Sequence, residues 1–360
     1  KKGCKENLQS RLDAYGIGNV ELVRYASVSY YYDLSVAKYL VNDTTFPGRF
    51  VKKKGQIYLN TWHGTPLKRM GCDNVEEICT MGNVQRNLIQ ADYVLFPNEY
   101  MRERMSQAYL LDNLAQGVIL EEGYPRNTVF FHNEKTEIIH NTLNSEGKQV
   151  IVYMPTFRGR VDALPVEQQI VQTKQILQKM DSYLQDDQIL IVNFHPFLRK
   201  NVEISGYKHI IAAPTQYDIY DVLNAADVLV TDYSSVLYDY GITDKAILLF
   251  AYDEDAYCAS RGIYEKLENY PFPKVTTVEQ LMSKIRNPQI SSRAHFRKRY
   301  DTYENPDATE RICRHVFLRK RVCRESKFVG NGKQNVLIYA GDLNKNGITT
   351  AFRSMMAGLD

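Results

Sequence analysis

Residues 227–236 read DVLVTDYSSV, a short apolar run that passes into a cluster of hydroxyl side chains. The part Asp227–Val230 predicts a buried strand, and the polar cluster behind it opens a helix. Helical patterns such as Val166–Leu184 and Ile219–Ala225 lie between further apolar runs. These runs predict strands at Gln56–Asn60, Tyr93–Phe96, Val118–Leu120, Gln149–Met154, Ile189–Phe194 and Ala246–Phe250. Strands that alternate with helices predict an α/β fold in which crossover helices join parallel strands.

The polar stretch His132–Lys148 separates two series of such elements. A chain of 360 residues is also too long for one typical core and suits two. We therefore predict two Rossmann-like domains, at residues 1–147 and 148–328. Residues 329–360 contain one more strand and the start of a helix, which cannot bury a core alone, and the chain begins at Lys1 without a methionine. We interpret 329–360 as the truncated start of a further domain, and the chain as a piece of a longer protein.

The composition narrows the class of protein. Hydrophobic residues make up 44% and charged residues 24%, an ordinary globular balance, and a net charge of +3 indicates no particular partner and no nucleic acid. The six cysteines form no CxxC pair, so a reducing cytoplasm fits better than a disulfide framework. Neither a signal peptide nor an apolar run of about 18 residues occurs, so we expect membrane attachment to be peripheral or to come from other segments.

The charge is uneven along the chain. Between Arg293 and Lys327 there are eleven Lys or Arg residues and only five Asp or Glu residues. Such a stretch can meet phosphates or an anionic membrane surface. A solvated helix face explains the same pattern equally well.

The segment Asn60–Lys68, NTWHGTPLK, follows a predicted strand. His63 would lie just beyond the carboxyl end of that strand, where ligands bind in open α/β sheets, and its imidazole could accept a proton from an attacking hydroxyl. Gly64 allows a close approach of the backbone to a ligand, and Lys68 could hold a phosphate. The alternative is a structural histidine that caps a turn.

His195 follows another predicted strand, in the sequence Asn193-Phe194-His195-Pro196. Two histidines at equivalent edges of two domains would face each other across a central cleft. The alternative is a turn histidine held by Pro196.

Three further segments could bind phosphate. Thr231–Ser235 opens a helix, and free amides and hydroxyls at a helix N-terminus favour anions, although simple N-capping gives the same pattern. Arg158 follows the strand Gln149–Met154, and its guanidinium fork suits a diphosphate. Arg126 could bind the donor or the acceptor, or could lie in a surface turn.

Motifs for a metal or a common nucleotide are weak or absent. Asp253-Glu254-Asp255 matches a DxD metal motif only superficially, and we interpret it as a solvated loop. A GxGxxG or Walker loop is absent, which disfavours dinucleotides and ATP.

Taken together, these segments resemble the CDP-glycerol glycerophosphotransferase family, the polymerases and primases of teichoic-acid synthesis. The resemblance covers roughly residues 20–320 and is an ordered series of matches. The series consists of Tyr30–Tyr32, Ala37–Tyr39, Tyr58–Lys68, Gly123–Asn127, Met154–Arg158, His195–Pro196, Thr231–Val236, Arg261–Tyr264 and Asp307–Ile312. The chain departs from the family at Phe157, where Trp is frequent, and at Asn193–Phe194, where Lys or Leu is frequent. Residues 335–360 fall outside the match and look like the opening of a GT-B sugar transferase.

The resemblance implies a GT-B-like fold with an acceptor domain at 1–147 and a nucleotide donor domain at 148–328, which ends in a basic helix. It implies that His63 is the catalytic base and that His195 stabilises the transferring phosphate or the leaving nucleotide. The implied donor site comprises Arg158, Thr231, Asp232, Ser234 and Ser235. Thr65, Lys68 and Arg126 are expected to bind the acceptor or a phosphate. This arrangement requires neither a metal nor a cofactor.

The expected reaction is in-line transfer of a polyol phosphate, most simply glycerol phosphate, from a CDP-linked donor to a hydroxyl, with release of CMP. The acceptor would be a lipid-linked or polymeric polyol phosphate or a glycan. We expect the protein to act in the cytoplasm, bound peripherally to the inner face of the cell membrane. Two alternatives remain: a GT-B glycosyltransferase that uses a nucleotide sugar, and a non-catalytic acceptor-binding module of a larger polymerase. Glycerol or ribitol as the polyol, and single or repeated addition, also remain open.

Overall fold

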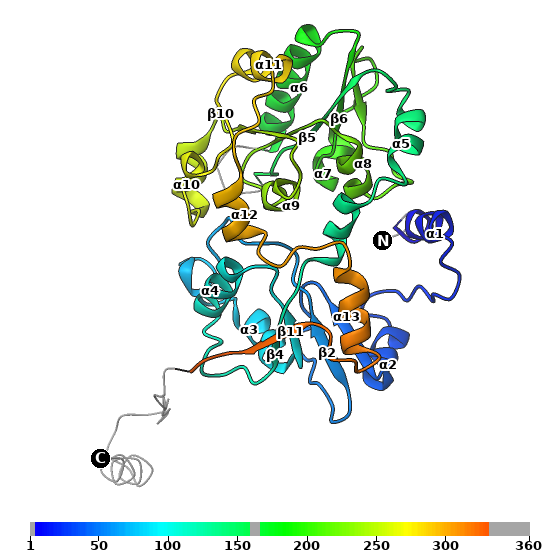
Figure 1. Cartoon of the computed structure of the whole chain (residues 1–360), viewed down its shortest axis with the longest axis vertical. Helices are drawn as coiled ribbons and strands as arrows, with labels where there is room; N and C mark the ends of the chain where they lie inside the picture. Colours follow the sequence, from blue (N-terminus) through cyan, green and yellow to red (C-terminus); the bar gives the residue numbers. More distant parts are fainter. Residues whose placement is uncertain (1–3, 159–165, 331–360) are drawn as a thin grey trace. The chain divides into compact units, whose positions relative to one another are not determined.

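The structure is a computed structural model that describes residues 4–158 and 166–330 (Figure 1). Residues Lys1–Phe328 form one compact unit, and this unit contains two sheets. The strand and helix expected within residues 335–356 lie outside the described residues. We call the two halves of the compact unit, each built around one sheet, the N-terminal and C-terminal lobes.

The N-terminal lobe is built on a five-stranded sheet of order β1-β2-β3-β4-β11. The first four strands are parallel, and β11 pairs with β4 in the antiparallel direction. Buried side chains of β2, β3 and β4 form its core together with residues of the surrounding helices. The strands are β1 (Tyr39–Asn42), β2 (Ile57–Asn60), β3 (Tyr93–Leu95), β4 (Val118–Glu121) and β11 (Arg324–Lys327). The helices are α2 (Val28–Val36), η1 (Gly71–Asp73), α3 (Gly82–Gln90), α4 (Glu99–Ala108), η2 (Pro125–Phe131) and α13 (Ala308–Val316).

The C-terminal lobe has six parallel strands in the order β7-β6-β5-β8-β9-β10. Alternate side chains of β5 enter different cores: Val150 and Val152 pack on one face, and Ile151 and Tyr153 on the other. Both faces are covered, which explains the continuous apolar runs in the sequence. The strands are β5 (Gln149–Met154), β6 (Gln188–Val192), β7 (Ile210–Ala212), β8 (Val228–Thr231), β9 (Ala246–Phe250) and β10 (Lys274–Val275).

The helices of this lobe connect its strands in the doubly wound pattern. They are α5 (Thr136–Leu143), α6 (Val166–Tyr183), α7 (Pro196–Asn201), α8 (Ile219–Ala225), α9 (Val236–Gly241), α10 (Glu254–Arg261), η3 (Leu267–Asn269), α11 (Val278–Arg286) and α12 (Ala294–Tyr300). The strand order reverses between β5 and β8, which is the point where ligands bind in such sheets. The predicted α/β fold with two Rossmann-like sheets is confirmed, and the helices lie around each sheet as Figure 1 shows.

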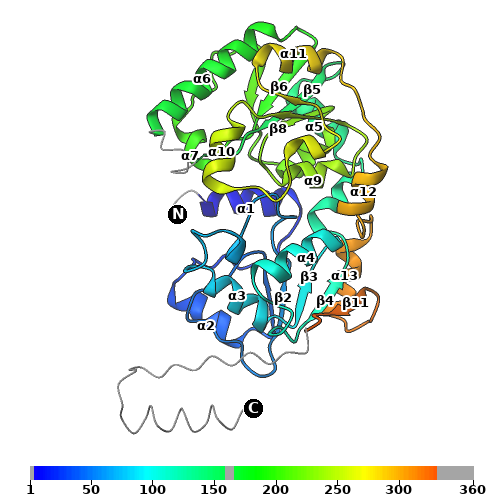
Figure 2. The same cartoon turned by 90° about the vertical axis from the view of Figure 1, so that its left-hand side faces the viewer.

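The predicted domain boundaries do not hold at the two ends of the unit. Residues 308–327, expected in the second domain, belong to the N-terminal lobe, because β11 pairs with β4 and Ile312 and Val316 enter the core of that lobe. Conversely, α1 (Cys4–Ala14), which Figure 2 shows beside the upper lobe, lies against the C-terminal lobe. Arg11 of α1 pairs with Asp218, and Tyr15 donates a hydrogen bond to Asp221. The chain therefore crosses between the lobes more than once.

The basic stretch Arg293–Lys327 is not one helix. It spans α12, α13 and β11, and most of its arginines have partners inside the protein. Arg311 pairs with Glu122, and Arg324 pairs with Glu121 on β4. The exposed remainder includes the turn Arg319–Arg321. Charge pairing within the fold therefore accounts for much of the basic pattern. Within the described residues, no helix is both long and apolar enough to cross a bilayer.

The place of α13 gives a stability prediction. Ile312 is 3% exposed and lies in the core of the N-terminal lobe, so Ile312→Ala should lower the free energy of unfolding by about 2–5 kcal/mol. Hydrogen exchange should then speed up in β3 and β4 before it does in β5 and β6. The neighbouring exposed Cys313, changed to Ala, is the control and should have little effect. Faster exchange in β5 and β6 first would contradict the assignment of α13 to the N-terminal lobe.

Candidate active site

His63 lies in the loop that follows β2, and its ring is exposed. The ring stacks on Trp62 with centroids 4.4 Å apart, and Nδ1 lies 2.9 Å from the backbone carbonyl of Asp43. A carbonyl oxygen can only accept, so the hydrogen bond requires the proton on Nδ1. The Nε2 atom then carries the free lone pair. The loop therefore holds His63 in the tautomer of a proton acceptor.

His195 has the opposite arrangement. It is the N-cap residue of α7, where its Nδ1 accepts a hydrogen bond from the backbone N–H of Phe197 at 3.3 Å. In the neutral ring the proton is therefore on Nε2, which can donate. The ring stacks on Phe157 with centroids 4.7 Å apart and planes 7° from parallel. Phe157 is one of the positions where the sequence departs from the related family, and here it fixes the plane of the histidine.

The two lobes meet where the loop of His63 reaches the start of α9. Gly64 has φ +145°, and a Cβ built on it would lie 2.9 Å from the hydroxyl oxygen of Ser235. Only glycine fits this contact. The Gly64 N–H also donates to the Tyr124 hydroxyl at 3.1 Å. The segments WHGTP and DYSS, which belong to different lobes, are therefore in contact through Gly64 and Ser235.

Arg126 links the same two segments from one side. Its Nη1 donates to the carbonyl of His63 at 2.9 Å, and its Nη2 donates to Asp239 of α9 at 2.9 Å. Burial opposes the charge on Arg126, but Asp239 raises the pKa of the guanidinium above its ordinary value. The Tyr220 hydroxyl also donates to Asp239, at 2.7 Å. Sequence reasoning missed Asp239, because nothing in the apolar stretch around it signals a partner for Arg126.

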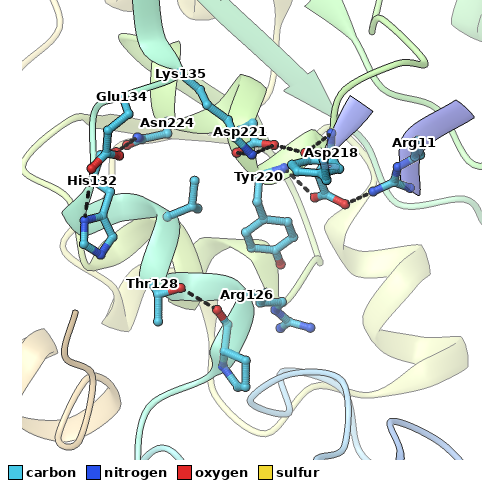
Figure 3. Close-up of a pocket in the computed structure, with 13 residues that line it drawn as sticks. Arg11, Arg126, Thr128, His132, Glu134, Lys135, Asp218, Tyr220, Asp221 and Asn224 are labelled. Carbon is cyan, nitrogen blue, oxygen red and sulfur yellow. Dashed lines mark hydrogen bonds and ion pairs between the residues drawn. The ribbon is translucent and has the colours of Figure 1, made fainter. Parts of the chain in front are cut away.

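Arg126 also lines a cavity of about 600 Å³ between η2, α8 and α1 (Figure 3). The ring of Tyr220 lies 5.2 Å from its guanidinium carbon, and its Nε has no hydrogen-bond partner among the described residues. Arg11 and Lys135 at the other end of the cavity pair with Asp218 and Asp221. Arg126 thus lines a cavity, while two of its donor groups already hold the protein together.

Arg158 is buried, and carboxylates of the protein bind its guanidinium group, which the sequence does not indicate. It is 6% exposed, and its Nε and Nη2 donate to the two oxygens of Asp253 at 2.6 and 2.9 Å. Its Nη1 donates to Asp232 at 2.8 Å and to the carbonyl of Thr156 at 2.7 Å. Asp253 is therefore an ion-pair partner and not part of a solvated loop, which corrects our interpretation. We infer that Arg158 contributes mainly charge and support to the site.

The side chains of three other predicted residues, Asp232, Thr231 and Thr65, also bind partners in the protein interior. Asp232 is 1% exposed and accepts hydrogen bonds from the backbone N–H groups of Thr156 and Tyr233. The Thr231 hydroxyl donates to the carbonyl of Met154 at 2.8 Å, and the Thr65 hydroxyl accepts from the Asn98 side chain at 2.9 Å. These contacts fix the loops after β2, β5 and β8. Ser234 and Ser235 remain half-exposed at the start of α9, which has only six residues.

Lys68 is a half-buried cation at the contact between the two lobes. Burial and the nearby Arg261 and Arg158 lower the pKa of its amino group to about 8, against the opposing charge of Asp232. No described carboxylate forms an ion pair with it. Its backbone pairs with Ile263 of the other lobe, and its amino group lies 5.7 Å from the ring centroid of Tyr257. A bound anion such as a phosphate would stabilise this charge.

The candidate residues thus include His63 with a free Nε2, His195 with its proton on Nε2, and Lys68 without an ion-pair partner among the described residues. Among residues 4–158 and 166–330, no group of three or more His, Cys, Asp or Glu side chains could hold a metal ion. Asp43 and Phe157, which orient the two histidines, were not predicted as site residues. Asp43 acts through its backbone carbonyl, so no side-chain pattern could have indicated it.

Known proteins match most of this chain. The family described as CDP-Glycerol:Poly(glycerophosphate) glycerophosphotransferase matches residues 7–318. A teichoic acid poly(glycerol phosphate) polymerase of Staphylococcus epidermidis is 32% identical over 286 residues, which cover 75% of this chain and 39% of that protein. A teichoic acid glycerol-phosphate transferase of Staphylococcus aureus is 29% identical over 321 residues, which cover 83% of this chain and 81% of that protein.

Solved structures give the same result. The wall teichoic acid polymerase TagF superimposes with a TM-score of 0.73 at 30% identity, over 84% of this chain and 78% of that one. A histidine variant of TagF, soaked with CDPG, superimposes with a TM-score of 0.72. The present chain spans about two fifths of the S. epidermidis polymerase.

The fold and the site define a two-lobed α/β protein of the GT-B type, with its candidate site at the lobe junction. The chain belongs to the CDP-glycerol:poly(glycerophosphate) glycerophosphotransferase family. The resemblance inferred from the sequence motifs is confirmed.

The lowered pKa of Lys68 predicts a pH dependence. With a pKa of about 8 instead of about 10.5, Lys68 is mostly charged at about pH 7 and mostly neutral at about pH 9. Its attraction for a phosphate should therefore weaken as the pH rises through 8. Titration calorimetry with CDP-glycerol, whose diphosphate does not titrate in this range, should show about a tenfold loss of affinity between these two pH values.

Lys68→Arg is the matched variant, because a guanidinium stays charged across the range. Its affinity for CDP-glycerol should not change with pH. A wild-type affinity that is equal at both pH values, or a loss of the same size in Lys68→Arg, would show that Lys68 does not bind the phosphates.

Proposed function

We propose that the chain transfers glycerol phosphate from CDP-glycerol to a hydroxyl group of an acceptor and releases CMP. The observation that carries this proposal is the geometry of His63: its Nδ1 is engaged by the Asp43 carbonyl at 2.9 Å, which leaves Nε2 free as a base. Family membership supports the choice of donor, because the matching family is described by this transfer. It also weighs against the rival in which a sugar is transferred from a nucleotide sugar.

The reaction is in-line substitution at the phosphorus distal to cytidine. The acceptor oxygen forms a new bond to that phosphorus as its proton passes to Nε2 of His63, and the bond between this phosphorus and the oxygen bridging to CMP breaks. CMP leaves with the bonding electron pair. Nε2–H of His195 donates to the phosphate oxygens, where negative charge accumulates, and Lys68 adds positive charge. The proton on His63 then passes to solvent.

The donor is placed at the reversal of strand order in the C-terminal lobe. Ser234 and Ser235 follow β8, and Thr156–Arg158 follow β5, so both segments lie at the carboxyl edge where nucleotides bind in doubly wound sheets. The two serine hydroxyls are the half-exposed donors at this edge. The acceptor approaches from the N-terminal lobe, where His63 and Arg126 lie. A polymeric or lipid-linked polyol phosphate fits this side, because its phosphates find cations there.

His63→Ala tests the proposal. Loss of a general base should slow CMP release by about 10²–10⁴-fold, while the dissociation constant of CDP-glycerol changes little. His140→Ala, which removes a histidine hydrogen-bonded to Ser145 on α5, is the control and should keep normal turnover. The product should be a phosphodiester with CMP. Wild-type turnover in His63→Ala, or a glycoside with a nucleoside diphosphate, would refute the assignment.

We further propose that α2 docks on the cytoplasmic face of an anionic membrane. None of the described residues of α2 is buried. Val28, Tyr32 and Val36 on this helix are 88%, 65% and 59% exposed. The amino group of Lys53 lies beside it and donates to the carbonyl of Ser35 at 3.0 Å. Exposed aromatic and aliphatic side chains with neighbouring lysines suit the interface of an anionic bilayer. This surface would bring the site to a lipid-linked acceptor.

Co-sedimentation with vesicles of phosphatidylglycerol tests the role of α2. The double change Tyr32→Ser and Val36→Ser should reduce binding by about tenfold, because burial of each side chain contributes about 1.5 kcal/mol or less at the interface. The control changes Ile138 and Val171 to Ser, since these are 53% and 54% exposed on α5 and α6. Equal losses in both double variants, or equal binding to neutral phosphatidylcholine vesicles, would exclude a specific membrane face on α2.

A further inference from the structure

A second large hollow lies on the compact unit, away from the two histidines. It has a volume of about 760 Å³ and is lined by residues of α4 and of the segment 264–300. We call it the arginine groove, after Arg104 and Arg299, which line it together with Lys266, Tyr264, Tyr270 and Tyr300. It therefore joins the N-terminal lobe to the C-terminal lobe.

Both arginines of the groove lie near the same aromatic ring. Their guanidinium carbons are 5.2 and 5.3 Å from the ring centroid of the same residue, Tyr100. Arg104 is also 5.2 Å from the ring of Tyr264. Aromatic rings hold the flat guanidinium groups in place, but they do not neutralise their positive charges.

The carboxylates of the groove do not balance its cations. Glu265 is the acidic residue that lines it; it pairs with Arg299 and accepts a hydrogen bond from the Tyr300 hydroxyl at 2.7 Å. Within the described part of the chain, Arg104 and Lys266 form no ion pair. The cavity around Arg126 differs, because its Arg11 and Lys135 pair with aspartates of α8. Two cations of the arginine groove, Arg104 and Lys266, thus lack a carboxylate partner among the described residues.

The groove is connected to the active site by direct contacts. The backbone N–H of Tyr264 donates to the carbonyl of Leu67 at 2.9 Å, next to Lys68. The Asn98 side chain donates both to the hydroxyl of Thr65, at 2.9 Å, and to the carbonyl of Tyr300, at 2.7 Å. A ligand in the groove therefore touches residues that hold the loop of His63.

We propose that the arginine groove binds phosphodiester groups of the acceptor chain, remote from the bond that is formed. This inference rests on the proposed function, in which the acceptor is a polyol phosphate. Guanidinium groups bind phosphate oxygens through paired hydrogen bonds. A long acceptor then occupies both the active site and the groove, so its affinity exceeds that of a short one.

Steady-state kinetics with a short and a long glycerol phosphate oligomer test the proposal. Arg104→Gln and, separately, Lys266→Glu should raise the KM of the long oligomer about tenfold each. The KM of the short oligomer, the KM of CDP-glycerol and kcat should stay unchanged. Lys174→Glu, at an exposed position of α6, is the control for charge alone. Lys266 is exposed, so its variant tests the groove even if Arg104→Gln unfolds.

Binding of the same oligomers, followed by titration calorimetry without donor, separates this proposal from the catalytic one. If CMP is never released but the long oligomer binds and loses affinity in Lys266→Glu, the groove is confirmed and the proposed reaction is wrong. Equal KM changes for short and long oligomers, or unchanged binding of the long one, would overturn the groove. Phosphatidylglycerol vesicles carry the same phosphodiester on a lipid; if they, and not the oligomers, depend on Lys266, the groove does not bind the acceptor chain.

Discussion

The ion pair between Arg126 and Asp239 is the contact on which the candidate site depends. Arg126 also donates to the carbonyl of His63, so one guanidinium connects the loop of His63 in one lobe to α9, which follows Ser234 and Ser235, in the other. The pair is partly buried and is reinforced by Tyr220 and Asn127, which both contact Asp239. Breaking it would leave Asp239 buried without its cation, which is more costly than the pair is stabilising.

The rest of the lobe junction is arranged around that contact. The backbone of Lys68 pairs with Ile263, and Gly64 lies against Ser235. The chain also crosses between the lobes at α1 and before α13, so the relative position of the lobes is held at several places. Such a junction suits in-line transfer, because the reaction depends on holding two reactants and several charges in fixed positions.

The charges of the protein fall into two groups. Arg158, Arg311 and Arg324 have carboxylate partners and hold loops and strands together. Lys68, Arg104 and Lys266 have no ion-pair partner within the described residues, and two of them line the groove that we assign to the acceptor chain. Arg158, Arg311 and Arg324 thus support the fold, whereas Arg104 and Lys266 line the groove where we propose that an anionic chain binds.

The sequence by itself determined the α/β fold, the approximate positions of seven strands, and the family, because apolar periodicity and ordered motifs are local in the chain. It also identified His63, His195 and Lys68 as candidates. It did not show that α13 and β11 return to the first lobe, since pairing of β11 with β4 is set by the free edge of the sheet and not by β11 itself. Only tertiary contacts decided the tautomers of the two histidines. The same holds for the carboxylates that bind Arg158 and for the partner of Arg126. The reason is physical: a motif specifies which groups are present, but the proton position of a histidine and the free charge of an arginine depend on neighbours that come from distant segments of the chain.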